Sequence, residues 1–104
     1  MNDGDIKFAE WIKQNKLAWE QIKSQFLITV AQDVEYLSVY DLIGWLKIQH
    51  PNIVENYTEF KVPHDLIPFM SRRLRAIYPP ADSIMRFETK YALTDEQAEE
   101  ILSL

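Results

Sequence analysis

The longest regular pattern of hydrophobic positions lies in the first third of the chain. Between residues 5 and 31, apolar side chains recur at intervals of three and four, which places them on one face of an α-helix. No glycine or proline interrupts this stretch. The pattern favours one long N-terminal helix over residues 5–31, with a helical hairpin that turns at Asn15 and Lys16 as the alternative.

Part of this apolar face has the heptad spacing of paired helices. The seam consists of Ile12, Asn15, Trp19, Ile22 and Phe26. A single polar asparagine in such a seam can fix the register between two helices, so one interpretation is a homodimer or a partner's helix docked here. The other interpretation is that the seam packs on the chain's own core.

A second helix is predicted to start at a capping box, Ser38–Asp41, and to stop before Pro51. Its positions are apolar nearly all round, which is typical of a helix in the middle of a fold. Gly44 interrupts it, although a glycine inside a helix costs about 1 kcal/mol relative to alanine. We therefore expect a neighbouring helix to approach closely at Gly44.

The remaining helices lie in the second half of the chain. One is predicted from an N-cap at Asp65 to about Tyr78, with Pro68 in its first turn. Its inner face is expected to contain Leu66, Ile67, Met70, Leu74 and Ile77. A further helix is expected from Pro80, with apolar positions at Ile84, Phe87 and Tyr91. A capping box at residues 94–97 predicts a short last helix.

Composition supports a helical fold. The chain has 104 residues, 47% of them hydrophobic, and only two glycines, which disfavours a fold rich in tight β-turns. The prediction is an all-α, compact single domain over residues 1–104 with about five helices. A winged-helix variant is the alternative, in which residues 35–37 and 57–62 pair as short strands.

Charge and cysteine content narrow the classes of partner and location. The net charge is −5, which opposes binding to nucleic acid and to anionic lipid. Only residues 64–90 carry a basic excess, whereas residues 91–104 are acidic and have no lysine or arginine. The polar, acidic start of the chain and the lack of long apolar runs predict no signal peptide and no membrane span. With no cysteine, a cytoplasmic location is expected.

The helix that contains three arginines is the main candidate for a binding surface. If its apolar residues face inward, Arg72 and Arg75 face outward, Arg73 lies at the flank and Phe69 sits one turn earlier. An aromatic ring beside guanidinium groups suits an acidic patch on a partner protein or a phosphate. The alternative is a solvated basic face, or a face covered by the acidic segment 93–104.

Catalytic chemistry has little support in the sequence. It contains no glycine-rich phosphate loop, no Gly-x-Ser-x-Gly and no His-Glu-x-x-His motif. His50, His64, Asp65 and Asp82 are potential metal ligands, but their spacing is too compact for a metal-dependent hydrolase, so we expect neither a metal nor another cofactor.

These observations favour a small, acidic, non-catalytic protein–protein interaction module, such as an adaptor, an inhibitor or an assembly component. The partner is expected to be another protein, with a homodimer as a second interpretation. The alternative function is a helix-turn-helix or winged-helix nucleic-acid-binding protein that uses the Arg72–Arg75 helix, although the connection over residues 52–62 is long for such a motif.

Overall fold

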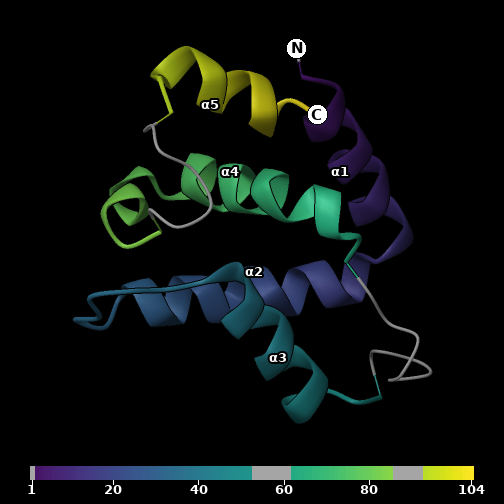
Figure 1. Cartoon of the computed structure of the whole chain (residues 1–104), viewed down its shortest axis with the longest axis vertical. Coiled ribbons are helices and arrows are strands. Elements are labelled where there is room, and N and C mark those ends of the chain that lie inside the picture. Colours follow the sequence, from purple (N-terminus) through teal and green to yellow (C-terminus); the bar gives the residue numbers. More distant parts are fainter. Residues whose placement is uncertain (1, 53–61, 86–92) are drawn as a thin grey trace.

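A computed structural model describes residues 2–52, 62–85 and 93–104, and its described elements are all helices. They are α1 (Asp3–Gln14), α2 (Lys16–Val30), α3 (Val39–Gln49), η1 (His64–Leu66), α4 (Ile67–Ile77), η2 (Pro79–Ser83) and α5 (Asp95–Leu102). Figure 1 shows α4 between α2 on one side and α5 on the other, with α3 at the far end of the molecule. The predicted all-α class is confirmed. The radius of gyration, 13.1 Å, is that of a compact domain of this length.

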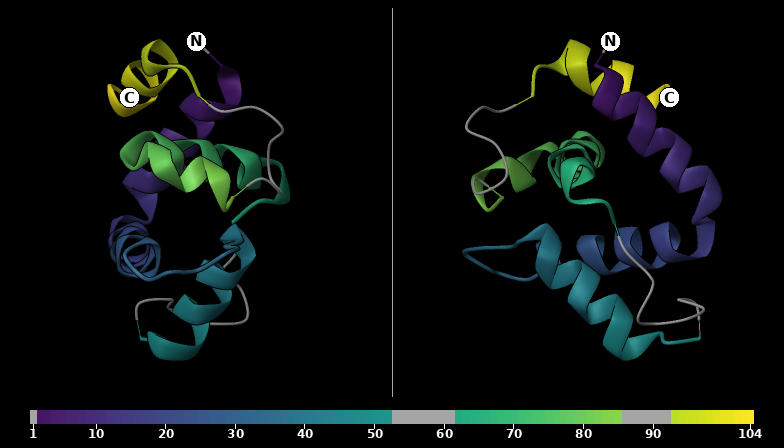
Figure 2. Two further views of the ribbon diagram at one scale, coloured as in Figure 1. Left: turned by 90° about the vertical axis from the view of Figure 1, so that its left-hand side faces the viewer. Right: turned by 45° about the vertical axis from the view of Figure 1, so that its right-hand side comes forward.

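The predicted single helix over residues 5–31 is wrong, because the chain turns at Asn15. Here α1 ends and α2 begins, and the two helices meet at an angle (Figure 2). The Asn15 side-chain amide donates to the Trp11 carbonyl oxygen at 2.9 Å, and its backbone N–H donates to the Ile12 carbonyl oxygen at 3.1 Å. Asn15 therefore satisfies carbonyl groups that the end of α1 leaves without helical donors. The alternative turn at Asn15 and Lys16 is the one that forms.

The turn brings the aromatic residues of α1 and α2 together. Phe8 stacks on Trp11 with ring centroids 5.5 Å apart and meets Trp19 edge-on at 5.4 Å. Ile22 and Phe26 continue this buried face along α2. The core is completed by fully buried side chains from α3, from α4 and from the segment after η2, namely Leu42, Leu46, Met70, Leu74 and Met85. The bend thus allows two short helices to bury one continuous apolar face.

The capping box predicted for α3 is present. The Tyr40 N–H donates to the Ser38 hydroxyl at 3.1 Å, and the Ser38 N–H donates to the Asp41 carboxylate at 3.2 Å. One face of α3 is buried against α2 and α4, through Val39, Leu42, Ile43 and Leu46. The expected central position is wrong, however, because α3 lies at one end of the molecule (Figure 1).

The second half of the chain follows the prediction only in part. Pro68 does lie in the first turn of α4, but Asp65 belongs to η1 and does not cap the helix. The capping box at the start of α5 is confirmed, with Thr94 and Gln97 each accepting the other's backbone N–H at 3.0–3.1 Å. Pro80 begins no long helix; it lies in η2, which ends at Ser83.

Several predictions fall on residues that the structure does not describe. The positions of Phe87 and Tyr91, and most of the 52–62 connection, are among them. Residues 35–37 form no strand, and the strand partner expected for them in the winged-helix alternative lies mainly outside the described residues. Instead, the Leu37 N–H donates to the Ile84 carbonyl oxygen at 3.0 Å, which ties the segment before α3 to the end of η2. Within the described ranges, no helix is both long enough and apolar enough to cross a bilayer.

Candidate functional site

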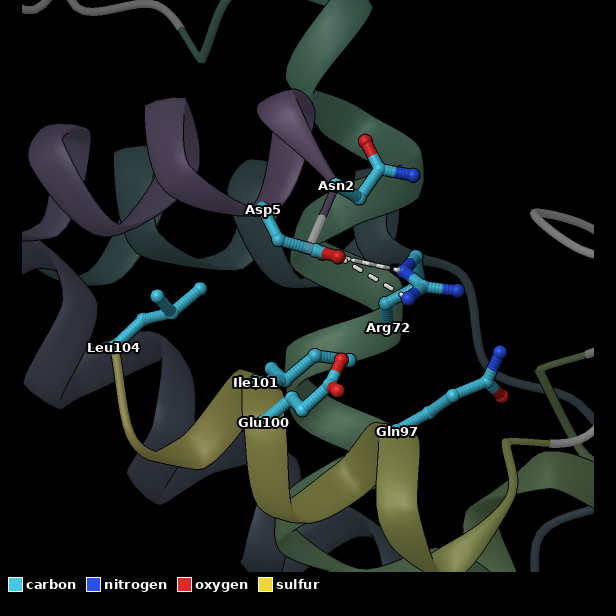
Figure 3. A pocket seen from close by; sticks show the side chains of 7 residues that line it. All are labelled: Asn2, Asp5, Arg72, Gln97, Glu100, Ile101 and Leu104. Atoms are coloured by element: carbon cyan, nitrogen blue, oxygen red, sulfur yellow. Dashed lines mark hydrogen bonds and ion pairs between the residues drawn. The ribbon is translucent and has the colours of Figure 1, made fainter.

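Arg72, predicted to face a partner, is bound within the fold. Its guanidinium Nε donates to both carboxylate oxygens of Asp5, at 3.1 and 3.3 Å, and its Nη2 donates to Oδ2 at 3.1 Å. This bidentate ion pair joins α4 to the first turn of α1 (Figure 3). Asp5 is only 5% exposed, so its carboxylate depends on the arginine for neutralisation. Arg72 therefore holds α4 against the first turn of α1.

Arg73 lies against the last helix. Its Nη1 donates to the Ile101 carbonyl oxygen near the end of α5, at 3.2 Å. Burial lowers the pKa of Arg73, because desolvation disfavours the charged guanidinium, while the negative charge of Asp5 acts in the opposite direction. The sequence left open whether the acidic tail docks on the arginine helix; in the structure α5 packs along α4 more extensively than any other element does.

The expectation that Arg75 faces outward is wrong. Its side chain is 2% exposed, its Nη1 lies 3.0 Å from a carboxylate oxygen of Asp82, and its Nε donates to the backbone and hydroxyl oxygens of Ser71 at 3.3 Å. Helical periodicity places Arg75 on the solvent side of α4, but the Tyr78–Pro79 turn brings Asp82 of η2 back over the end of α4. The spacing of Arg75 and Asp82 across two prolines was the available signal, and it was missed.

Phe69 is also engaged within the chain. A Cβ atom placed on Gly4 would lie 2.1 Å from Cζ of the Phe69 ring, so the ring rests directly on the backbone of the first turn of α1. Phe69 is half-buried and packs against the main core. The proposed aromatic anchor for a partner is thus a contact between α4 and α1, and Gly4 is the residue that makes room for it.

The four predicted partner-binding residues therefore do not form one open surface. Phe69 and Arg72 contact α1, Arg73 contacts α5, and Arg75 contacts η2.

A polar hollow of about 240 Å³ lies beside the Asp5–Arg72 pair. It is lined by Asn2, Asp5, Arg72, Gln97, Glu100, Ile101 and Leu104 (Figure 3). No histidine, serine or lysine is among these lining residues, and the Asp5 carboxylate is already bound by Arg72. The ionisable side chains that line the hollow are those of Asp5, Arg72 and Glu100.

The heptad seam packs inward. Trp19, Ile22 and Phe26 are buried in the core, and Asn15 forms the turn between helices. Ile12 is partly buried against the same core. The seam therefore packs on the chain's own core, which was the alternative to a helix–helix interface. Its buried members are not accessible to another chain.

The two histidines have aromatic neighbours. His64 Nδ1 lies 3.0 Å from the Tyr40 hydroxyl, and the His50 ring meets Trp45 edge-on at 5.1 Å. In the described part of the chain, no three His, Asp or Glu side chains come close enough together to hold a metal ion.

Among the described residues, an exposed apolar ridge lies on α3. Tyr40, Gly44 and Ile48 follow one another at intervals of four residues, so they form a single ridge on the side opposite the core. Tyr40 is 51% exposed and Ile48 is 72% exposed. Asp41 and Lys47 flank this ridge, three residues before and after Gly44. We call these five residues the α3 outer face.

Gly44 leaves a gap in the middle of this face. Among the described residues, no atom outside the helix lies within 4 Å of the place that a Cβ on Gly44 would occupy. None of the described helices therefore makes the close approach that was expected at Gly44. Sequence periodicity missed the α3 outer face because it treats every apolar residue as a core residue.

Comparisons of the chain with protein-family models, with curated proteins and with solved structures gave no match.

Proposed function

We propose that this chain is a small, non-catalytic protein–protein interaction module, of the adaptor, inhibitor or assembly-component kind, and that the α3 outer face is its contact surface. The observation that carries the proposal is the exposure of Tyr40 and Ile48 on either side of Gly44, where no described atom lies within 4 Å of the place of a Cβ. Removing an isoleucine side chain from water is worth roughly 1.5–3 kcal/mol, so this ridge offers a partner a substantial apolar contact.

The position of α3 supports an external contact. It lies at the end of the molecule farthest from α5 (Figure 2), and its Tyr40 and Ile48 side chains are exposed among the described residues. The Tyr40 hydroxyl is held by His64, which fixes the exposed ring before binding and reduces the entropy lost when a partner docks. The absence of cysteine suits a cytoplasmic setting, which we propose as the location.

The nucleic-acid alternative has no comparable support. Arg72, Arg73 and Arg75 are each engaged by another element, and the net charge of −5 opposes phosphate binding. An enzymatic role has less support, because no histidine, serine or lysine is among the residues that line the polar hollow.

The test is capture of partners from a lysate of the source cell by immobilised protein, with and without nuclease. The Ile48→Glu variant should lose a stoichiometric protein partner that the wild-type chain retains after nuclease treatment. Leu17→Glu is the matched control, since Leu17 is 70% exposed on α2, and it should retain the partner. Equal capture by Ile48→Glu, or capture that disappears with nuclease, would refute the proposal.

A further inference from the structure

We propose that the α3 outer face binds a second copy of the same chain, in a weak symmetric dimer in which two α3 helices cross at Gly44. This inference rests on the proposed function, because it names a partner for the same surface. It is carried by the gap at Gly44 and by the arrangement of charges around it.

The gap determines how closely another helix can approach. Side chains keep most packed helices 8–10 Å apart, and a glycine at the crossing point permits a shorter distance. The helix itself would be more stable with alanine here, and no described part of the chain lies within 4 Å of the place of a Cβ on Gly44, so the described structure leaves room for the close approach of a second helix. Tyr40 and Ile48, one turn away on either side, then pack around the crossing point.

The charged side chains on either side of the ridge favour a second copy of the chain as that neighbouring helix. Asp41 and Lys47 lie on opposite sides of the Tyr40–Gly44–Ile48 ridge. When two such ridges lie side by side in the same direction, with helix axes crossing at about −50°, the Asp41 of each copy comes next to the Lys47 of the other. One two-fold axis thus gives two identical ion pairs, and the face is complementary to itself as a symmetric dimer requires.

The opposite direction is disfavoured by the same charges. If the second helix runs antiparallel across Gly44, each Asp41 comes next to the Asp41 of the other copy, and each Lys47 next to the other Lys47. Like charges in contact weaken association. The sign of a charge effect therefore distinguishes the two arrangements.

The contact is small. α3 has 11 residues, so it is about 16 Å long and contributes one ridge of side chains to the interface. An interface of this size belongs to the weak, transient class, with a dissociation constant on the order of 100 µM.

Sedimentation equilibrium of the purified full chain, from about 20 µM to about 1 mM, tests the inference across that dissociation constant. The wild-type chain should change from mostly monomer to mostly dimer over this range. Ile48→Glu should be monomeric throughout, while Leu17→Glu should dimerise as the wild type does. A wild-type chain that stays monomeric at the highest concentration would overturn the inference.

Two substitutions probe the geometry. Gly44→Ala should raise the dissociation constant about tenfold while the monomer becomes no less stable in urea, because the new methyl group blocks the crossing but favours the helix. Asp41→Asn keeps an oxygen that can accept the Ser38 N–H, and it should weaken the dimer about threefold through loss of the two ion pairs. An unchanged dimer in Gly44→Ala, or a tighter dimer in Asp41→Asn, would overturn the parallel crossing at Gly44.

The outcomes also separate this inference from the proposed function. A monomeric wild-type chain that still captures a lysate protein through Ile48 would leave the interaction role intact and remove only the self-association. A dimer that depends on Ile48, with no protein captured from lysate, would keep the dimer and remove the adaptor role.

Discussion

The contact between Gly4 and Phe69 can be tested by adding a single methyl group. In Gly4→Ala, the new Cβ would lie 2.1 Å from Cζ, 2.2 Å from Cε2 and 2.5 Å from Cε1 of the Phe69 ring. Ordinary carbon–carbon contacts are about 3.5–4.0 Å, so the ring must move by more than about 1 Å or α1 must shift away from α4.

The size of the effect follows from three contributions. Forcing extra volume into a packed contact usually costs about 1–3 kcal/mol. Alanine regains up to about 1 kcal/mol of helix propensity, and less than this in a first turn. Phe69 is only half-buried, so part of the strain is relieved by moving its ring outward. We expect a net destabilisation of about 1–2 kcal/mol, which lowers the melting temperature of a domain of this size by roughly 5–10 °C.

Urea unfolding followed by tryptophan fluorescence is a suitable assay, because Trp11 and Trp19 lie in the core beside Phe8. The same Gly4→Ala change in a Phe69→Ala background should be neutral or slightly stabilising, since the ring that it strikes is gone. The two changes should therefore be non-additive by about 1 kcal/mol or more. A Gly4→Ala variant as stable as the wild type would show that Phe69 does not rest on the α1 backbone.

Three other substitutions test the internal polar contacts, each by urea unfolding. Asp5→Ala leaves a partly buried arginine without its carboxylate and should destabilise the fold by about 2 kcal/mol, while Asp3→Ala, on the exposed side of the same turn, should change stability by less than about 0.5 kcal/mol. Arg75→Ala removes a fully buried cation and should cost about 3 kcal/mol; an effect under about 1 kcal/mol would mean that the pair with Asp82 is not buried. Asn15→Ala removes the side-chain cap of α1 and should cost about 1 kcal/mol, and unchanged stability would show that the backbone alone makes the turn.

Local features were the part of the fold that the sequence predicted well. The capping boxes at Ser38 and Thr94 were identified correctly because the whole interaction lies within four residues. Pro68 was placed in a first turn for the same reason, since its missing N–H is tolerated only there. The all-α class followed from these signals together with low glycine content.

Features that depend on distant contacts were not predictable in the same way. The turn at Asn15 leaves the apolar phase of α1 and α2 unbroken, so periodicity gave no sign of it. Arg75 is buried only because Asp82 arrives from η2, and Phe69 is covered only because Gly4 lies in the element that packs on it. The candidate arginine surface was assigned to solvent by helical periodicity, whereas the arrangement of the other helices determines its exposure.

The polar hollow has a consequence for the ends of the chain. Asn2 and Leu104 both line it, so the first and last described residues lie close together (Figure 1). A short peptide linker can therefore join them without disturbing α1 or α5. Backbone cyclisation of this kind removes conformations from the unfolded chain and leaves the folded contacts in place, which raises the free energy of unfolding. A fusion tag at either end, in contrast, would sit beside the Asp5–Arg72 pair, at the opposite end of the molecule from α3.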